Sequence, residues 1–195
     1  GYGAVNGRLV YAFVQDSARM RGAFDSTSAG KIAELIRLAA RNGAPVVGIF
    51  DSCGASIYEG ARVLAAYGEV MRQINAVKGT IPLIALIPGV CGGGMAAFAS
   101  TFDFILTVSG QSVFYVSPPF ISGEAPSDGT SVADIAVADV DELYPRTREL
   151  LSYLPSNCNE GARMSDAPVF DRDIPTEYLA PKEYDARKIV ACLSD

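Results

Sequence analysis

The sequence of 195 residues contains no histidine. Its absence excludes Ser-His-Asp and Cys-His catalysis, metal sites with histidine ligands and acid–base chemistry by imidazole. The cysteines are scattered and form no CxxC pair, so we expect neither structural zinc nor a disulfide framework. We therefore expect no metal, and chemistry must come from backbone donors, carboxylates, hydroxyls or a partner chain. The four cysteines are Cys53, Cys91, Cys158 and Cys192.

Basic clusters and long apolar runs are also missing. The formal net charge of −6 argues against nucleic acid as a partner. No apolar run approaches the roughly 18–20 residues that a membrane-spanning helix needs, and no signal-peptide pattern opens the chain. We therefore expect a cytoplasmic protein. The hydrophobic fraction of 49% predicts a compact globular chain, and the length predicts a single domain over residues 1–195.

Strand and helix patterns alternate along the chain. Asn6-Gly7 predicts a β-hairpin within residues 1–16. The continuous apolar runs at 45–50 and 82–87 predict strands that are covered on both faces, and the alternation favours an α/β layer. Residues 117–139, rich in Pro, Gly, Ser and Asp, predict an irregular segment. Further strands are expected at 103–108 and 112–116, helices at 28–41, 59–78 and from about 139 to 154, and an extended C-terminal segment with a short helix at 155–195.

Glycine-rich turns follow the two apolar runs. Gly92-Gly93-Gly94 lies between the run at 82–87 and a short stretch of small residues. Without side chains the backbone can approach a ligand closely, and free N–H groups at a helix start then point at it. This is the layout of an oxyanion hole, although a tight crossing that only permits packing is an equal alternative. Cys53-Gly54-Ala55 follows the run at 45–50, so both turns are expected at one edge of the sheet.

Several segments resemble, in the same order, those of biotin-dependent acyl-CoA carboxyltransferases. Residues 51–60, DSCGASIYEG, are similar to the family's DSGGARIQEG, and residues 90–95, VCGGGM, resemble PCAGGA. Residues 11–16 resemble VFAQDF, residues 42–48 resemble NGAPVIG, and residues 150–157 match LLSYLPSN. The matches run through most of the chain.

The resemblance implies a crotonase-like α/β fold, a ββα superhelix. It implies the acyl-CoA-binding N-terminal half of an enzyme that moves a carboxyl group between biotin and the α-carbon of a short acyl-CoA. Backbone oxyanion holes would stabilise the enolate. The implied catalytic residues are Gly54, Ala55, Gly93 and Gly94, and the implied substrate-binding residues are Cys53, Ser56, Gly92 and Met95.

The resemblance also implies partners. Biotin would arrive on a biotin carboxyl carrier protein, a C-terminal carboxyltransferase half or subunit would supply most of the biotin side, and the assembly would be a homo- or hetero-oligomer of the trimer or hexamer type. Ser56 stands where the family has arginine, Cys53 replaces a glycine, and the stretch after Pro118-Pro119 is shortened. These departures favour an alternative, a non-catalytic crotonase-fold subunit that binds acyl-CoA or scaffolds a complex.

Other residues keep two interpretations each. Glu59 is a candidate general base or a carboxylate that stabilises a helix start. Ala96 stands where enoyl-CoA hydratases of the same superfamily carry a catalytic glutamate, which disfavours hydration. Arg19, Arg21 and Lys31 are candidates for contact with the phosphates of CoA, or simply surface charges.

Overall fold

The structure is a computed structural model that describes residues 1–195 except 124–126, 162–173, 176–177, 179–185 and 194–195. The chain groups into two compact units, Gly1–Arg163 and Met164–Asp195. The second unit contains the helix α7, Ala186–Leu193, within the helix expected near the C-terminus. A single domain over 1–195 stays a prediction. Among the described residues, no helix combines the length and apolarity needed to cross a membrane.

The first unit begins with the predicted hairpin. Strands β1, Tyr2–Val5, and β2, Arg8–Val14, pair antiparallel. Asn6 and Gly7 between them both have positive φ, 51° and 75°, as a two-residue turn of this hand requires. The hairpin prediction is confirmed.

A six-stranded sheet forms the centre of this unit, in the order β1-β2-β3-β4-β6-β9. From β2 onward all neighbours run parallel. The apolar runs become β3, Val46–Ile49, and β4, Leu83–Ile87, and β4 is buried throughout. The remaining strands are β6, Phe104–Val108, and β9, Ile135–Val137.

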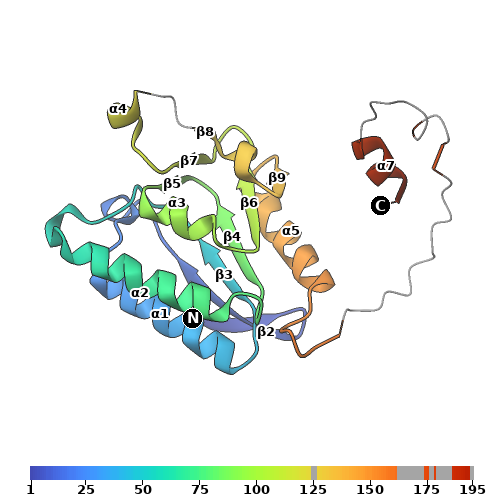
Figure 1. Ribbon diagram of the computed structural model, residues 1–195, viewed down its shortest axis with the longest axis horizontal. Coiled ribbons are helices and arrows are strands. Elements are labelled where there is room, and N and C mark those ends of the chain that lie inside the picture. The colour runs from blue at the N-terminus through green and yellow to red at the C-terminus, as the bar shows by residue number, and fades with distance from the viewer. Residues whose placement is uncertain (124–126, 162–173, 176–177, 179–185, 194–195) are drawn as a thin grey trace. The chain divides into compact units, whose positions relative to one another are not determined.

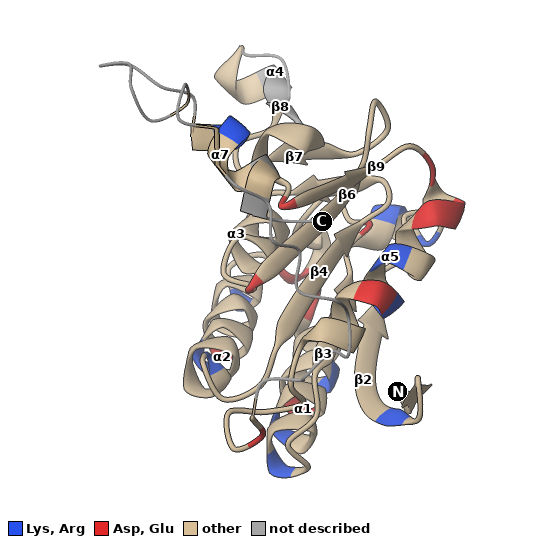
Figure 2. Ribbon diagram, turned by 90° about the vertical axis from the view of Figure 1, so that its right-hand side faces the viewer, with Lys and Arg blue, Asp and Glu red and all other residues tan. Residues whose placement is uncertain are grey.

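Helices cover both faces of the sheet (Figure 1). Helices α1, Ser26–Arg41, and α2, Arg62–Val77, lie side by side on one face, and α5, Val140–Tyr153, packs on the other. Asp25 caps α1 by accepting a hydrogen bond of 2.7 Å from the Ser28 N–H, and Asp139 caps α5 in the same way. In Figure 2 the charged residues colour these three helices, whereas β3 and β4 contain none.

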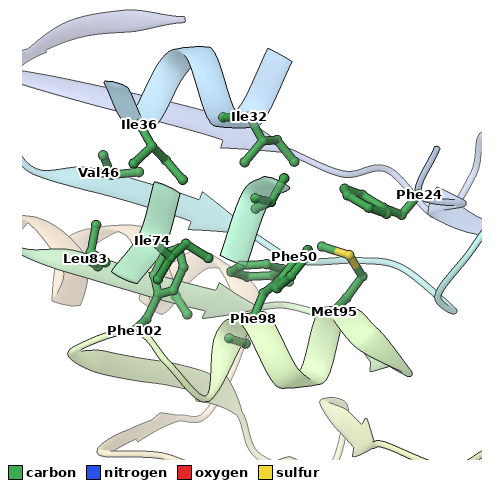
Figure 3. Close-up of a cluster of buried hydrophobic side chains, with 14 of the residues drawn as sticks. Phe24, Ile32, Ile36, Val46, Phe50, Ile74, Leu83, Met95, Phe98 and Phe102 are labelled. Atoms are coloured by element: carbon green, nitrogen blue, oxygen red, sulfur yellow. The ribbon is translucent and has the colours of Figure 1, made fainter. Parts of the chain in front are cut away.

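The alternation of side chains along β4 divides the apolar interior in two. Leu83, Ala85 and Ile87 face the core under α1 and α2, which includes the residues of Figure 3. Ile84 and Leu86 face the core under α5. A strand covered on both faces must be apolar at every position, which explains the continuous run in the sequence.

A second, small sheet carries the region after β4. It consists of β5, Val90–Gly92, β7, Val113–Tyr115, and β8, Ser127–Asp128, in the order β5-β7-β8. The short helix α3, Gly94–Ala99, follows β5. The strand expected at 112–116 is therefore present, but it pairs with β5 and β8.

The expectation of an irregular segment at 117–139 is wrong in part. This segment includes α4, Pro119–Ser122, a 3₁₀ turn at Gly129–Val132 and the strand β9, which extends the main sheet beside β6. Three residues, Ile-Ala-Val, are too few for a periodic pattern, so only the pairing with β6 reveals the strand. The predicted helix at 59–78 begins as a 3₁₀ turn at Ile57–Glu59 and becomes α2 at Arg62.

Candidate active site at two glycine turns

Two turns meet at the carboxyl ends of β3 and β4. We call Cys53–Ser56 the first turn and Gly92–Gly94 the second turn. An isolated parallel bridge joins Ser52 to Cys91, with the Ser52 N–H donating to the Val90 carbonyl at 2.6 Å and the Gly92 N–H donating to the Ser52 carbonyl at 2.9 Å. The structure therefore brings together the two turns that the sequence placed at one sheet edge.

The two turns are in direct contact through their glycines. A Cβ on Gly54 would lie 3.4 Å from the Gly92 carbonyl oxygen, and a Cβ on Gly93 would lie 3.7 Å from the Gly54 Cα. Gly54 has φ of +116° and Gly93 has φ of +62°, conformations that other residues adopt only with strain. Glycine is therefore required at both positions by conformation.

Most backbone amides of the turns already have acceptors. The Gly54 N–H donates to the Ser52 Oγ at 3.1 Å, and the Gly93 N–H donates to the Tyr115 carbonyl at 2.9 Å. The amides of Ala55 and Gly94 donate to no acceptor within the described residues. Of the predicted catalytic residues, Ala55 and Gly94 therefore offer unpaired N–H groups.

Phe24 holds the first turn from the opposite side. Its N–H donates to the Gly54 carbonyl at 2.9 Å, and its carbonyl accepts from the Ser56 N–H at 2.7 Å. In a parallel bridge of this kind the intervening residue, Ala55, directs its own N–H away from the partner strand. The bridge thus explains why the Ala55 amide is unpaired while its neighbours are not.

Asp51 ties the surrounding loops together, a role that the sequence did not indicate. Its Oδ2 accepts from the Ser17 Oγ at 2.5 Å and the Ser17 N–H at 3.3 Å, and its Oδ1 accepts from the Val90 N–H at 3.1 Å. A Cβ on Gly89 would lie 2.5 Å from Oδ1, so only glycine fits there. Asp51 thereby fixes the approach of β5 to the first turn.

A cavity of about 590 Å³ opens beside the first turn. The Ala55 residue in its lining is exposed, and Ser56 is 8% exposed. All four residues of the first turn line this cavity, and all four were predicted site residues, Gly54 and Ala55 for catalysis and Cys53 and Ser56 for binding of substrate. Arg21 and Tyr115 line the same cavity.

A larger cavity of about 780 Å³ lies beside β2 and α1 and is lined in part by Arg19 and Lys31. Arg21 lines the smaller cavity instead. The three basic residues considered for phosphate contact are therefore divided between two cavities, and the first turn belongs to the smaller one.

Met95 and Gly92, two of the predicted substrate-binding residues, are buried. Met95 is fully buried and lies against Phe24 in the core (Figure 3). Gly92 is buried, and a Cβ on it would lie 2.5 Å from the Tyr115 ring. The Met95 side chain therefore belongs to the core, and a role of Met95 in binding substrate stays a prediction.

The positions of Cys91 and Glu59 indicate structural roles for both residues. Cys91 is fully buried, and burial raises the pKa of its thiol to about 12, so it is not a thiolate at neutral pH. The Glu59 Oε2 accepts from the Ser26 N–H at 2.9 Å and from the Ser26 Oγ at 2.6 Å. Glu59 thus binds the first residue of α1, where a carboxylate is favourable.

Two tyrosines beside the second turn were missed by the sequence analysis. Tyr67 on α2 packs between Phe24 and Phe98, with ring centroids 4.6 Å and 5.1 Å away, and a Cβ on Gly94 would lie 2.3 Å from its ring. Tyr115 covers Gly92. In the sequence, Gly92 and Gly94 indicate only that some group could approach the backbone closely. They do not indicate which residue does so.

The carboxyl transferase domain model matches residues 1–195, the whole chain. The chain belongs to the carboxyl transferase domain family. It is 35% identical to methylmalonyl-CoA decarboxylase subunit alpha of Veillonella parvula and 34% identical to the propionyl-CoA carboxylase beta chain of Roseobacter denitrificans. In both comparisons 100% of this chain aligns with 42% of the relative, so this carboxyl transferase domain spans less than half the length of these relatives.

Solved structures agree with this assignment. The transcarboxylase 12S hexamer with bound methylmalonyl-coenzyme A and methylmalonic acid matches with a TM-score of 0.81 and 29% identity, over 100% of this chain and 42% of that chain. A malonate decarboxylase hetero-tetramer from Pseudomonas shares the fold, with a TM-score of 0.70 and 21% identity over 98% of this chain and 78% of that chain. The expected crotonase-like α/β fold is confirmed.

Proposed function

We propose that this carboxyl transferase domain binds a short acyl-CoA and stabilises its enolate with the amides of Ala55 and Gly94. The observation that carries the proposal is that two turns in direct contact each present one N–H group, of Ala55 and of Gly94, with no acceptor among the described residues. Gly54 and Gly93 would shape the turns, while Ala55 and Gly94 would donate. The reaction would be transfer of a carboxyl group between biotin and the acyl α-carbon.

The chemistry requires donors at one oxygen. When the α-carbon loses or gains a carboxyl group, negative charge develops on the thioester oxygen. Hydrogen bonds to a charged oxygen are about twice as strong as neutral ones, and two fixed amides need no reorganisation when the charge appears. The chain has no histidine, which suits a site whose donors belong to the backbone.

The two turns supply donors for one charged oxygen. The unpaired amides found at the two turns are both assigned to the thioester oxygen, which leaves none at the turns for a second charged oxygen. Biotin would supply the carboxyl group, presented by a carrier protein. A C-terminal half or subunit would hold it, which accords with a chain that spans 42% of its relatives. An oligomer and a cytoplasmic location remain predictions.

Two basic residues favour the larger cavity as the binding site for the nucleotide end of CoA. Arg19 and Lys31 line it together, in a chain whose net charge is −6. Two cations in one cavity are suited to phosphate groups. We therefore propose that phosphates bind near Arg19 and Lys31 and the thioester near the first turn.

A substitution matched for backbone strain tests the proposed function in the full-length protein with its partners. Gly93→Ala and Gly60→Ala both force alanine into nearly the same backbone conformation, with φ of +62° and ψ of −134° at Gly93 and φ of +54° and ψ of −133° at Gly60, and no side chain is in the way at either position. Both variants should lose similar stability. Only Gly93→Ala should lose transfer, by about 100-fold, because it displaces the second turn. Full transfer by Gly93→Ala would overturn the proposal.

The second candidate is a non-catalytic subunit that binds acyl-CoA or scaffolds a complex. Ser56 favours it: the side chain is small and largely buried, so it brings no charge to the cavity where the resembled segment has arginine. Binding of acyl-CoA without transfer, in a complex reconstituted with the C-terminal half and a biotinylated carrier, would favour this candidate.

A further inference from the structure

Tyr115 is held against the second turn by both its backbone and its ring. Its carbonyl accepts the Gly93 N–H at 2.9 Å. Its ring covers Gly92 so closely that a Cβ there would lie 2.5 Å from Cζ and 2.6 Å from the hydroxyl oxygen. The ring position is therefore fixed relative to the second turn.

The Tyr115 hydroxyl also reaches the first turn. Tyr115 and Cys53 line the same cavity, and Cys53 is exposed. Burial raises the pKa of the Tyr115 hydroxyl, and the Cys53 thiol raises it further through charge repulsion and a hydrogen bond. The Cys53 side chain is therefore a neighbour of the Tyr115 hydroxyl, and the two side chains lie where the first turn meets the second turn.

This contact lies beside the exposed Ala55, on the same cavity. If the Ala55 amide binds the thioester oxygen, atoms attached to the thioester carbon must lie within a few bonds of that amide. The side chains next to it on the cavity wall then limit the size of the acyl group. An aromatic ring and a small thiol side chain pack well against a hydrocarbon chain.

We propose that Tyr115 and Cys53 together form the wall that restricts the acyl group to short chains. This inference rests on the proposed function and deepens it, because it names the residues that select among acyl-CoA substrates. The Tyr115 ring forms the larger part of this wall. The Cys53 thiol lies between the Tyr115 hydroxyl and the backbone of the first turn. Removal of either should enlarge the cavity toward the acyl side.

The first test measures preference among substrates. Full-length protein in its complex is assayed for kcat/KM with unbranched acyl-CoAs of two to six carbons. Cys53→Gly and Tyr115→Leu should each raise the ratio of long-chain to short-chain kcat/KM by about tenfold, as expected for one or two methylene groups in an apolar pocket. The double variant should fall short of the product of the two single effects, because the residues form one wall.

Cys158→Ser is the matched control for this test. Cys158 is also exposed, but it is absent from the lining of the cavity. Its substitution should leave the ratio unchanged. Tyr115→Phe keeps the ring over Gly92 and removes only the hydroxyl, so it guards against a folding defect in Tyr115→Leu.

The second test needs no transfer. Alkylation of the cysteines is followed by mass spectrometry with and without acetyl-CoA, propionyl-CoA or hexanoyl-CoA. Cys53 should be protected by the shorter thioesters more than by hexanoyl-CoA, Cys158 should react equally in all samples, and the buried Cys91 should stay unreactive.

The outcomes separate the two proposals. Protection of Cys53 and active transfer, with an unchanged chain-length ratio in Cys53→Gly, Tyr115→Leu and Tyr115→Phe, would overturn the wall and leave the proposed function standing. Absence of both protection and transfer with every acyl-CoA would overturn both. A raised ratio in either variant, with Cys158→Ser unchanged, supports the wall.

Discussion

The two glycine turns touch each other, yet different forces fix them. The first turn is open to solvent on one side, and its backbone is held by hydrogen bonds to the Ser52 Oγ and to the N–H and carbonyl of Phe24. The second turn lies under aromatic rings, with Tyr115 against Gly92 and Tyr67 against Gly94. A side chain in the first turn is therefore opposed mainly by backbone strain, and a side chain in the second turn is opposed largely by steric clash with the aromatic rings. Substitutions in the two turns should destabilise the protein for these different reasons.

The largest effect is expected at Gly94. Alanine there would place its Cβ 2.3 Å from the Tyr67 ring, which is itself packed between Phe24 and Phe98. Overpacking of this kind costs about 1–3 kcal/mol of unfolding free energy, and displacement of the Gly94 amide should lower transfer by about 100-fold. Urea unfolding and a transfer assay of the full-length protein measure the two losses.

The control for Gly94→Ala is a glycine on the neighbouring helix α2. Gly68 on α2 has open space around it, so Gly68→Ala should leave transfer intact and stabilise the helix slightly. Adding Tyr67→Leu to Gly94→Ala should restore part of the lost stability if the clash is the cause. Wild-type stability in Gly94→Ala alone would contradict the packing explanation.

Gly54→Ala should cost less, and no second substitution should restore it. The nearest atom to the new Cβ is the Gly92 carbonyl oxygen at 3.4 Å, at the edge of ordinary contact, so strain from φ of +116° dominates. Such strain costs about 1–3 kcal/mol. Gly79→Ala, with φ of +77° and open space, should lose a comparable amount in urea unfolding. An unchanged Gly54→Ala would show that the first turn tolerates a side chain.

The same contrast explains what the sequence could and could not predict. Local signals were sufficient for the hairpin at Asn6-Gly7 and for the buried strands β3 and β4, because turn chemistry and apolar runs are properties of neighbouring residues. The adjacency of the turns followed from the parallel order of those strands. The pairing of Val90–Gly92 with Val113–Tyr115 is non-local, and no pattern in either segment specifies it.

The identity of the unpaired amides was beyond the sequence for the same reason. Four glycine and alanine amides were candidates, and the Tyr115 carbonyl, more than twenty residues from Gly93, removes one of them. Ser52 removes another through its side chain. Motif resemblance located the turns, whereas the assignment of donors needed the contacts.

The buried thiol of Cys91 allows the second turn to be tested through the pH dependence of the free energy of unfolding. Burial raises the pKa of Cys91, beside the second turn, from 9.0 to about 12. The unfolded chain releases this proton above pH 9 while the folded chain retains it, so the free energy of unfolding falls as pH rises from about 9 to 12. In Cys91→Ala this fall should be smaller, as measured by urea unfolding at pH 8, 9.5 and 11 under reducing conditions.

The outcome for Cys91→Ala decides this test. A pH dependence in Cys91→Ala equal to that of wild type would show that the buried thiol does not contribute.

The smallest expected effect has the opposite sign. The Tyr67 hydroxyl is buried and has no hydrogen-bond partner among the described residues, and its burial, with a smaller contribution from Cys91, raises its pKa to about 12. An unpaired buried hydroxyl costs roughly 1–3 kcal/mol, so Tyr67→Phe should stabilise the protein by about 1 kcal/mol in urea unfolding. The ring against Gly94 is retained, so transfer should be unchanged.

Tyr11→Phe is the matched comparison for Tyr67→Phe. The Tyr11 hydroxyl is also in a buried residue, but it accepts a hydrogen bond of 2.8 Å from the Asn42 Nδ2. Its removal leaves the Asn42 Nδ2 with only its hydrogen bond to the Leu38 carbonyl and should destabilise the protein by about 1 kcal/mol. If both variants lose stability, the Tyr67 hydroxyl must have an acceptor or donor near the second turn. The second turn would then depend on hydrogen bonds as much as the first turn does.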